Sequence, residues 1–379
     1  MVRETGLPRL MRSLMSRSFE RMGAWTRVAL AALSVASGCA TLPDNPDVAA
    51  VRNFYLHEVR DPECAVASDK AIAGDPHRIF RIASLGKLFV EMALRRMERE
   101  GRLDMDASVR SVSKLGLPPE YDAIALRELL ENRSGLPREF LNPWNPLDWH
   151  TALMCGLIGT HIYAGFDGRD DFAAELSSRR SRAFLREKVP QYSNMGFALL
   201  TLCVEDVTGR TIDEIVRAEL VEPLGLEDTS FCPIGEERER VAPPCAGKLP
   251  WLFRRGSEVP EHRLGPALRG MGSLFSSAAD CAKVFRAYWE LVDGALAEKP
   301  LDGFAEGEDV RLLRVRTLKM TDGRSRRILY RFGMIYGGGS FVAFDPSTRS
   351  FLVILRNVTS WPAAEDFEVS ARFFGKSTW

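Results

Sequence analysis

The sequence predicts a mixed α+β (α/β) fold, in which an antiparallel sheet is flanked by helices and an all-helical subdomain is inserted between its two parts. Helical periodicity dominates the chain after residue 47, and the middle, about 103–244, consists of helical segments joined by loops rich in Pro and Gly. The end of the chain instead has short apolar runs separated by turn residues, which indicate strands. We therefore expect the sheet and its helices to be built from about 47–102 and 245–379.

The composition is that of a folded protein with one large or two interleaved domains. The chain has 379 residues, of which 45% are hydrophobic, and its 51 basic residues balance its 51 acidic ones. A net charge of zero argues against nucleic acid as a partner, because neutralising phosphates requires an excess of Lys and Arg. No Cys-x-x-Cys occurs and the five His residues have no metal-ligand spacing, so we expect neither a metal nor a cofactor.

Residues 1–38 have the order of a secretory signal peptide. Six Arg and two Glu occupy residues 1–27, and residues 28–37 are small and apolar. These ten residues are fewer than the roughly 20 that a membrane-spanning helix needs. The segment ends in Ala-Ser-Gly-Cys, which resembles the lipobox of bacterial lipoproteins, so we predict that Cys39 is lipidated and becomes the mature N-terminus. We expect an exported, lipid-anchored protein of the periplasm or cell envelope; plain cleavage and release is the alternative.

The remaining elements follow in order along the chain. Residues 47–58 have a helical pattern, a mixed stretch continues to residue 79, and an apolar helix runs from Ser84 to Arg99. Four strand-like runs come near the end: residues 310–317, 326–334, 340–344 and 351–358. Turn residues between them predict an antiparallel meander, and a helix over 363–374 closes the chain.

Six cysteines remain after Cys39, and export would permit disulfides between them. Cys203 and Cys281 occupy apolar positions in helical patterns, so we expect them to be buried thiols. Cys232 and Cys245 bracket a Pro-rich loop, and they are the pair that we predict to be bridged.

Ser84 and Lys87 form a Ser-x-x-Lys motif at the start of the apolar helix. Positions i and i+3 lie on the same helix face, so the Lys amine can reach the Ser hydroxyl. A serine hydroxyl is a poor nucleophile until a base removes its proton, and a lysine can be that base only if burial lowers its pKa. Backbone N–H groups at the helix N-terminus can also stabilise an oxyanion. These two residues are the candidates for a nucleophile and its activating partner.

Two further patterns have less weight when taken alone. A second Ser-x-x-Lys, residues 111–114, lies between polar and Pro-rich segments, and we interpret it as surface. Tyr192 and Asn194 form a Tyr-x-Asn motif just before an apolar helix, where a phenol can transfer protons and an amide can position a substrate. The simpler explanation of this motif is a helix cap by Asn194 with Tyr192 packed in the core.

Together these motifs resemble the serine β-lactamase and penicillin-binding-protein superfamily, in the branch that holds class C β-lactamases, family VIII carboxylesterases and DD-peptidases. The similarity rests on these segments: residues 80–87, 126–130, 134–137, 192–197, 222–226 and 272–280. It implies one domain over residues 39–379, with Ser84 as the acylated nucleophile and Lys87 as its activating partner. It further implies that Tyr192 is the general base and acid, with Lys87 holding its phenolate form, and that Asn194 binds the substrate. Which of Lys87 and Tyr192 takes the first proton is left open by the resemblance. The N–H of Ser84 and a strand N–H beside a third motif would form the oxyanion hole.

Two features depart from this resemblance. Where the third motif should read Lys-Thr-Gly or His-x-Gly, we identify Tyr336, Gly337, Gly338 and Gly339, which include no cation. Esterases of this branch often have an aromatic-Gly-Gly motif, so we expect these four residues to bind substrate; a flexible hairpin loop is the alternative. Only the twenty residues 60–79 separate the first helix from the nucleophile segment, so we expect a sheet smaller by one or two strands.

We therefore predict an exported serine hydrolase that forms a covalent acyl-enzyme on small ester or amide substrates. A β-lactamase or DD-peptidase is the nearest alternative, and the missing cation counts against it. The third hypothesis is a catalytically silent cell-envelope binding protein of the same fold. The short front end favours this hypothesis, and the intact Ser-x-x-Lys and Tyr-x-Asn motifs oppose it.

Overall fold

A computed structural model of the chain describes residues 46–139, 168–247, 256–261, 264–320, 323–359 and 364–375. These residues all belong to a single unit. The predicted signal peptide, residues 1–38, and Cys39 lie outside the described residues, so export and lipidation stay predictions. Within the described ranges, no helix is both long and apolar enough to cross a membrane.

A seven-stranded antiparallel sheet forms the centre of this unit, with the strand order β2-β1-β9-β8-β7-β6-β5. Its strands, in chain order, are β1 (Cys64–Ser68), β2 (Ile72–Ala73), β5 (Asp309–Val310), β6 (Leu313–Lys319), β7 (Ser325–Ile335), β8 (Gly338–Asp345) and β9 (Ser350–Arg356). Strands β5 to β9 are neighbours both in the chain and in the sheet, which confirms the predicted meander. Strand β1 pairs with β9, so an early segment of the chain completes a sheet built mostly from its end.

The expected loss of strands before the nucleophile segment requires correction, because residues 60–79 contain both β1 and β2. A tight turn makes this possible: the Ser68 N–H donates to the carbonyl of Ala71, and the Ser68 hydroxyl accepts from the Ala71 N–H. The shortened element is β2, whose two residues pair with Val66 and Ala67 of β1. The short segment before the nucleophile therefore shortens β2 but removes no strand from the sheet.

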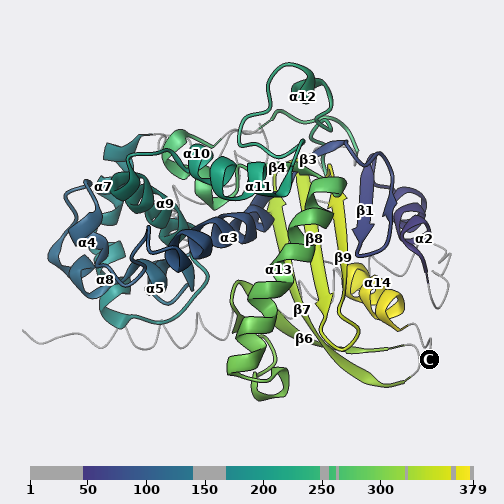
Figure 1. Ribbon diagram of the computed structural model, residues 1–379. Helices are drawn as coiled ribbons and strands as arrows, with labels where there is room; N and C mark the ends of the chain where they lie inside the picture. The colour runs from purple at the N-terminus through teal and green to yellow at the C-terminus, as the bar shows by residue number, and fades with distance from the viewer. Residues whose placement is uncertain are drawn as a thin grey trace, which may run out of the picture. The chain divides into compact units, whose positions relative to one another are not determined.

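Different helices cover the two faces of the sheet. Successive side chains of a strand point to opposite faces, so neighbouring residues of one strand pack against different helices. The helices that cover them are α2 (Val48–Asn53), α3 (Gly86–Arg99), α13 (Ala278–Glu298) and α14 (Ala364–Phe374). Val342 and Phe344 of β8 share a core with α3 and α13, whereas Phe341 and Ala343 share one with α2 and α14. In Figure 1, α13 crosses one face of the sheet while α2 and α14 lie near β1 and β9. The predicted helices over 47–58, 84–99 and 363–374 are thus confirmed, the first continuing into the π-helix η1 (Phe54–Glu58).

The middle of the chain is helical, as predicted. Between β3 (Ile79–Arg81) and β4 (Phe275–Ser277), the described residues form helices and loops and no named strand. The helices here are α4 (Val109–Val112), η3 (Pro119–Ala123), α5 (Leu126–Leu130), α7 (Arg169–Leu176), α8 (Arg179–Glu187), α9 (Asn194–Thr208), α10 (Ile212–Val216), η4 (Arg217–Val221), α11 (Glu222–Leu224), α12 (Glu236–Glu239) and η5 (Pro266–Met271), and η6 (Leu301–Gly303) follows α13. Helix α9 forms the core of this part. Ser111 and Lys114 of the second Ser-x-x-Lys are both exposed, as predicted.

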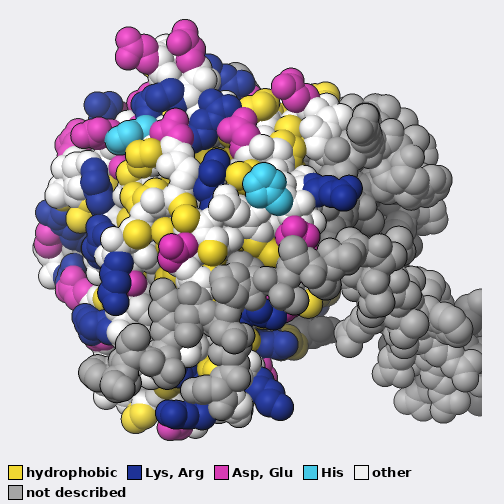
Figure 2. Space-filling model, turned by 90° about the vertical axis from the view of Figure 1, so that its right-hand side faces the viewer, with side chains coloured by type: hydrophobic (Ala, Val, Ile, Leu, Met, Phe, Trp, Pro, Cys, Tyr) yellow, Lys and Arg dark blue, Asp and Glu magenta, His cyan; other side chains and the backbone are white. Residues whose placement is uncertain are grey.

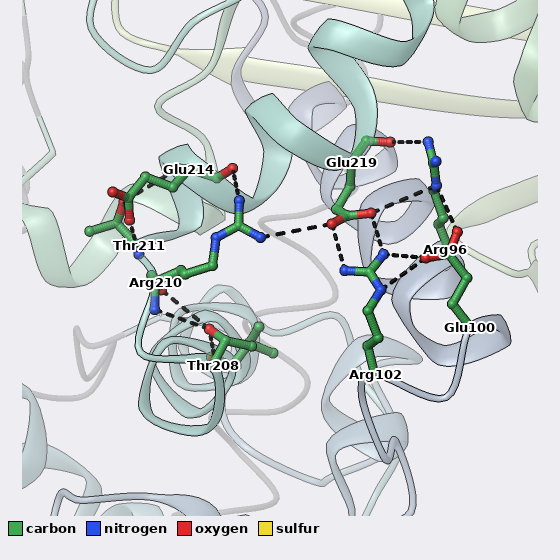
Figure 3. A network of polar contacts seen from close by, with 9 residues as sticks. Arg96, Glu100, Arg102, Thr208, Arg210, Thr211, Glu214 and Glu219 are labelled. Atoms are coloured by element: carbon green, nitrogen blue, oxygen red, sulfur yellow. Dashed lines mark hydrogen bonds and ion pairs between the residues drawn. The ribbon is translucent and has the colours of Figure 1, made fainter.

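A buried carboxylate joins the helical part to the end of α3 (Figure 3). Glu219, in the π-helix η4, is 6% exposed and accepts from both terminal nitrogens of Arg102, at 2.7 and 2.6 Å. Arg96 of α3 donates to the Glu219 carbonyl at 3.2 Å, and Arg210 approaches the carboxylate from the other side. Several cations around one buried carboxylate offset its desolvation, so this cluster holds α3 against the helical part.

The cysteines of the described residues are all free. Cys203 and Cys281 are buried thiols, as predicted. The predicted bridge between Cys232 and Cys245 is wrong, because the two thiols lie in different environments: Cys232 is exposed, whereas Cys245 is buried and accepts from the Asn357 amide at 3.5 Å. Burial raises the pKa of the Cys245 thiol to about 11, so the thiolate form is disfavoured at neutral pH.

Candidate active site

The candidate nucleophile lies at a sharp bend of the chain. Strand β3 pairs with β4, and the chain then turns through the 3-10 helix η2 (Ala83–Leu85) into α3. Ala83 has a φ of 47°, a left-handed conformation that is strained for a residue with a Cβ. The N–H of Leu85 donates to the carbonyl of Ile82 at 3.0 Å and closes the turn. Ser84 therefore occupies a bend that leads directly into a largely buried helix.

Lys87 is fully buried one helical turn after Ser84. Its amine donates to Ser84 Oγ at 3.2 Å, to Asn194 Oδ1 at 2.9 Å, and to the carbonyl of Met271. Burial lowers the pKa of Lys87, because the charged amine is removed from water, while the neighbouring Tyr192 acts in the opposite direction. The expected pairing of a serine with a desolvated lysine is therefore present in the geometry.

Tyr192 reaches Ser84 from the turn before α9. Its hydroxyl lies 2.8 Å from Ser84 Oγ and donates to Asn194 Oδ1 at 3.0 Å. The cap of α9 is Ser193, whose hydroxyl accepts from the Gly196 N–H and donates to the carbonyl of Pro137. The interpretation of Asn194 as the cap is thus wrong, and its side chain instead joins Lys87 and Tyr192.

The surroundings of Tyr192 favour its ionised form. Burial of the phenol acts to raise its pKa, but the cations of Lys87 and Arg331 and hydrogen bonds from Lys87 and Ser84 outweigh this effect. The pKa of Tyr192 therefore lies below its ordinary value. A phenol with a lowered pKa beside a serine hydroxyl is suited to accept the serine proton.

The four residues that we identified as the third motif lie at a hairpin. Tyr336 and Gly337 form the turn between β7 and β8, and Gly338 and Gly339 begin β8. The carbonyl of Tyr336 accepts from Arg81 at 3.3 Å, and the N–H of Gly337 donates to a threonine hydroxyl at 2.7 Å. The first two residues therefore form a hairpin turn, and substrate binding by the four residues stays a prediction.

The segment of β7 that meets the nucleophile turn lies a few residues earlier. A Cβ placed on Gly333 would lie 2.4 Å from the carbonyl oxygen of Ile82 and 2.9 Å from the nitrogen of Leu85, so only glycine fits there. Two residues before it, the guanidinium of Arg331 lies 4.6 Å from the centre of the Tyr192 ring. Arg331 is 8% exposed and donates to the carbonyl of Leu312 at 3.1 Å.

These contacts correct the statement that the third motif has no cation. Arg331, Phe332 and Gly333 have the cation-x-Gly order, and they occupy the strand that packs on the Ser84 turn. Strand β6 pairs with β7 only as far as Tyr330, so beyond it this edge of β7 faces the nucleophile turn. The cation-x-Gly order lies within the predicted strand 326–334, five residues before the aromatic-Gly-Gly pattern.

Besides Arg331, two further residues of the site were not singled out from the sequence. Arg138 and Glu139 follow the Ser-Gly-Leu-Pro segment and lie against the Tyr-x-Asn turn. The Arg138 guanidinium lies 5.1 Å from the centre of the Tyr192 ring, and Glu139 Oε1 accepts from Asn194 Nδ2 at 2.7 Å. Within the described residues, no group of His, Cys, Asp and Glu is suited to hold a metal ion.

The fold and the site together define a class of protein. A serine at a helix N-terminus, a buried lysine one turn later and a phenol 2.8 Å from the serine are the groups needed for acyl transfer through a covalent serine intermediate. The chain belongs to the Beta-lactamase family, whose model matches residues 66–372. The recognised superfamily and the mixed α+β fold are thereby confirmed, and the members of this family are serine hydrolases as a class.

Solved structures of the same fold extend along most of the chain. A D-stereospecific amidohydrolase from a Streptomyces species has a TM-score of 0.60 and 20% identity, and the match covers 88% of this chain and 100% of that one. A class C beta lactamase from Rhodobacter sphaeroides has a TM-score of 0.62 and 17% identity, and the match covers 87% and 99%. At these identities the likeness shows the fold alone.

Relatives found by sequence match over shorter stretches. The protein flp of Staphylococcus aureus is 26% identical over 166 residues, which are 43% of this chain and 30% of that protein. A beta-lactamase-like protein of Arthroderma benhamiae is 23% identical over 225 residues, 56% of this chain and 36% of that protein. The chain thus spans about a third of the length of these relatives.

Proposed function

We propose that this protein is a serine acyl hydrolase that acts through a covalent acyl-enzyme on small esters or amides. The observation that carries the proposal is the position of Ser84 Oγ, 2.8 Å from the Tyr192 hydroxyl and 3.2 Å from the amine of Lys87. The lowered pKa values of both partners add to it, because a base must lose its proton readily before it can activate serine.

The reaction follows from these positions. Tyr192, as the phenolate, takes the proton of Ser84 while the serine oxygen bonds to the substrate carbonyl carbon and the carbonyl electron pair moves to its oxygen. The N–H of Ser84 and an N–H of β7 beside Gly333 would hold this oxyanion. When the tetrahedral intermediate collapses, the bond to the leaving group breaks and Tyr192 returns the proton to that group. Water then repeats the sequence and releases the acid, with Lys87 stabilising the phenolate throughout.

A second candidate function is the hydrolysis of β-lactams or of D-alanyl peptides. Arg331 favours it, because a cation on the third strand can meet a substrate carboxylate, and the expected absence of that cation was the main argument against it. Against it, the Arg331 guanidinium is almost buried and already donates to the carbonyl of Leu312. On the face shown in Figure 2, acidic and basic side chains are interspersed rather than gathered by sign, so this face gives no support to a nucleic-acid partner.

Release of nitrophenol from short-chain nitrophenyl esters would test the proposal. A protein that begins after Cys39 is expected to hydrolyse these esters, and Ser84→Ala should lower kcat/KM by at least about 10³-fold. Nitrocefin as a parallel substrate separates the two candidates, because a β-lactamase would open it faster than it hydrolyses the esters. Turnover that is equal in the wild type and in Ser84→Ala, or absent from both, would support the silent binding protein instead.

We further propose that the protein is exported and lipidated at Cys39, on the strength of the charged-then-apolar order of residues 1–38 and the Ala-Ser-Gly-Cys that ends it. In bacteria fed an alkyne-tagged fatty acid, the full-length chain is expected to take up the tag and Cys39→Ser is not. Equal labelling of the two proteins, or none of either, would contradict lipidation at this cysteine.

A further inference from the structure

The side-chain amide of Asn194 is held from both sides. Its oxygen accepts from the amine of Lys87 at 2.9 Å and from the hydroxyl of Tyr192 at 3.0 Å. Its nitrogen donates to Glu139 Oε1 at 2.7 Å. Three separate segments therefore meet at one amide: helix α3, the turn before α9, and the loop that follows α5.

Only one orientation of this amide satisfies its neighbours. If the amide were rotated by half a turn, its N–H groups would face the donating amine of Lys87, and its oxygen would face the carboxylate of Glu139. Lys87 is fully buried, so water could not relieve that contact. The network thus selects the orientation in which the oxygen faces the catalytic pair.

The loop that supplies Glu139 is itself fixed to the same turn. The backbone carbonyl of Arg138 accepts from the N–H of Asn194 at 3.0 Å, and the carbonyl of Pro137 accepts from the hydroxyl of Ser193 at 2.7 Å. The backbone just before Glu139 is therefore hydrogen-bonded to Ser193 and Asn194, the two residues that follow Tyr192.

We propose that Glu139 is a positioning residue, which fixes the amide of Asn194 and thereby holds the amine of Lys87 and the phenol of Tyr192 in place beside Ser84. This inference rests on the proposed hydrolase function. The amide nitrogen has two N–H groups, and Glu139 takes one of them, so at most one is left to contact a substrate. Because Glu139 acts through the alignment of Lys87 and Tyr192 and not through contact with the substrate, we expect its substitution to change kcat rather than KM.

Two substitutions separate orientation from charge. Glu139→Ala removes the acceptor and should lower kcat on nitrophenyl esters about ten- to a hundredfold, with KM changed by less than about threefold. Glu139→Gln keeps an acceptor oxygen at the same place and should restore kcat to within about threefold of the wild type. Glu236→Ala, on the exposed helix α12, is the matched control and should leave both constants unchanged.

Equal losses in Glu139→Ala and Glu139→Gln would overturn the proposal, because charge rather than orientation would then be responsible. A Glu139→Ala protein with kcat within about twofold of the wild type would overturn it too. If the wild type hydrolyses no ester, the proposed function fails, and the rate at which a fluorophosphonate labels Ser84 replaces turnover. Labelling that is slower in Glu139→Ala than in Glu139→Gln would then support positioning, equal rates would overturn it, and a wild type that is not labelled would overturn both proposals.

Discussion

Tyr55 and Tyr192 each lie beside a basic side chain, but the two regions that hold them differ in charge. Tyr55, in η1, donates to the buried carboxylate of Asp366 at 2.6 Å, and Arg356 lies 4.8 Å from the centre of its ring. Burial and the charge of Asp366 raise the pKa of Tyr55 well above its ordinary value. Tyr192 lies beside Lys87 and Arg331, and its pKa is lowered.

The difference teaches that the local sum of charges decides what a phenol can do. Around Tyr55, the cation of Arg356 is outnumbered by two carboxylates, Asp61 at 3.5 Å and Asp366 at 3.3 Å. Around Tyr192, the described cations include Lys87, Arg331 and Arg138, with Glu139 as the nearby carboxylate. An excess of carboxylates keeps the Tyr55 phenol protonated and gives a structural clamp between η1 and α14, whereas an excess of cations favours the phenolate that the proposed reaction needs.

Removing each of the two tyrosine hydroxyls, in separate variants, is the strongest test of this comparison. Tyr192→Phe should lower kcat/KM for nitrophenyl esters about 10²- to 10⁴-fold, because the proposed base is removed, and should alter stability little. Tyr55→Phe is the matched control: it should keep the activity and lower the free energy of unfolding, because a hydrogen bond to a charged group is lost. Kinetics and urea unfolding on the same two proteins measure both effects. A fully active Tyr192→Phe would contradict the assigned base.

Removing the cation from the region around Tyr55 should affect folding and not chemistry. Arg356→Met leaves the buried Asp61 and Asp366 without their guanidinium, and we expect the free energy of unfolding to fall by about 3–5 kcal/mol. Urea denaturation measures the loss, and the activity of the folded fraction should stay at the wild-type level. A stability change below about 1 kcal/mol would show that this cluster is not the clamp that its burial indicates.

Removing a cation from the site should shift its pH dependence. The base is active above the pKa of Tyr192, and the Arg331 cation lowers that pKa, so Arg331→Ala should move the acidic limb of the kcat/KM profile to higher pH. A shift of about one unit would lower activity on the acidic limb roughly tenfold. Arg331→Lys keeps the charge and should move the limb back toward the wild type. An unmoved limb in Arg331→Ala would remove this residue from the electrostatics of Tyr192.

Residues that act within one helical turn were predictable. Ser84 and Lys87 are three positions apart at a helix start, and a helix places such residues on one face wherever it packs. The meander of β6 to β9 was equally local, because turn residues separate its apolar runs. The bridge between Cys232 and Cys245 failed for the opposite reason, since a short separation in sequence says nothing about where two thiols point.

The sequence by itself determined the class of this protein: a mixed fold, a serine with its lysine, and the tyrosine that meets them. Tertiary structure decided which glycine of the third strand meets the nucleophile turn, and so brought Arg331 rather than Tyr336 against Tyr192. It also decided that Glu139 holds the Asn194 amide. The physical reason is common to both, because the register of a strand against a distant turn, and the approach of a loop to a helix start, are set by the packing of the whole core.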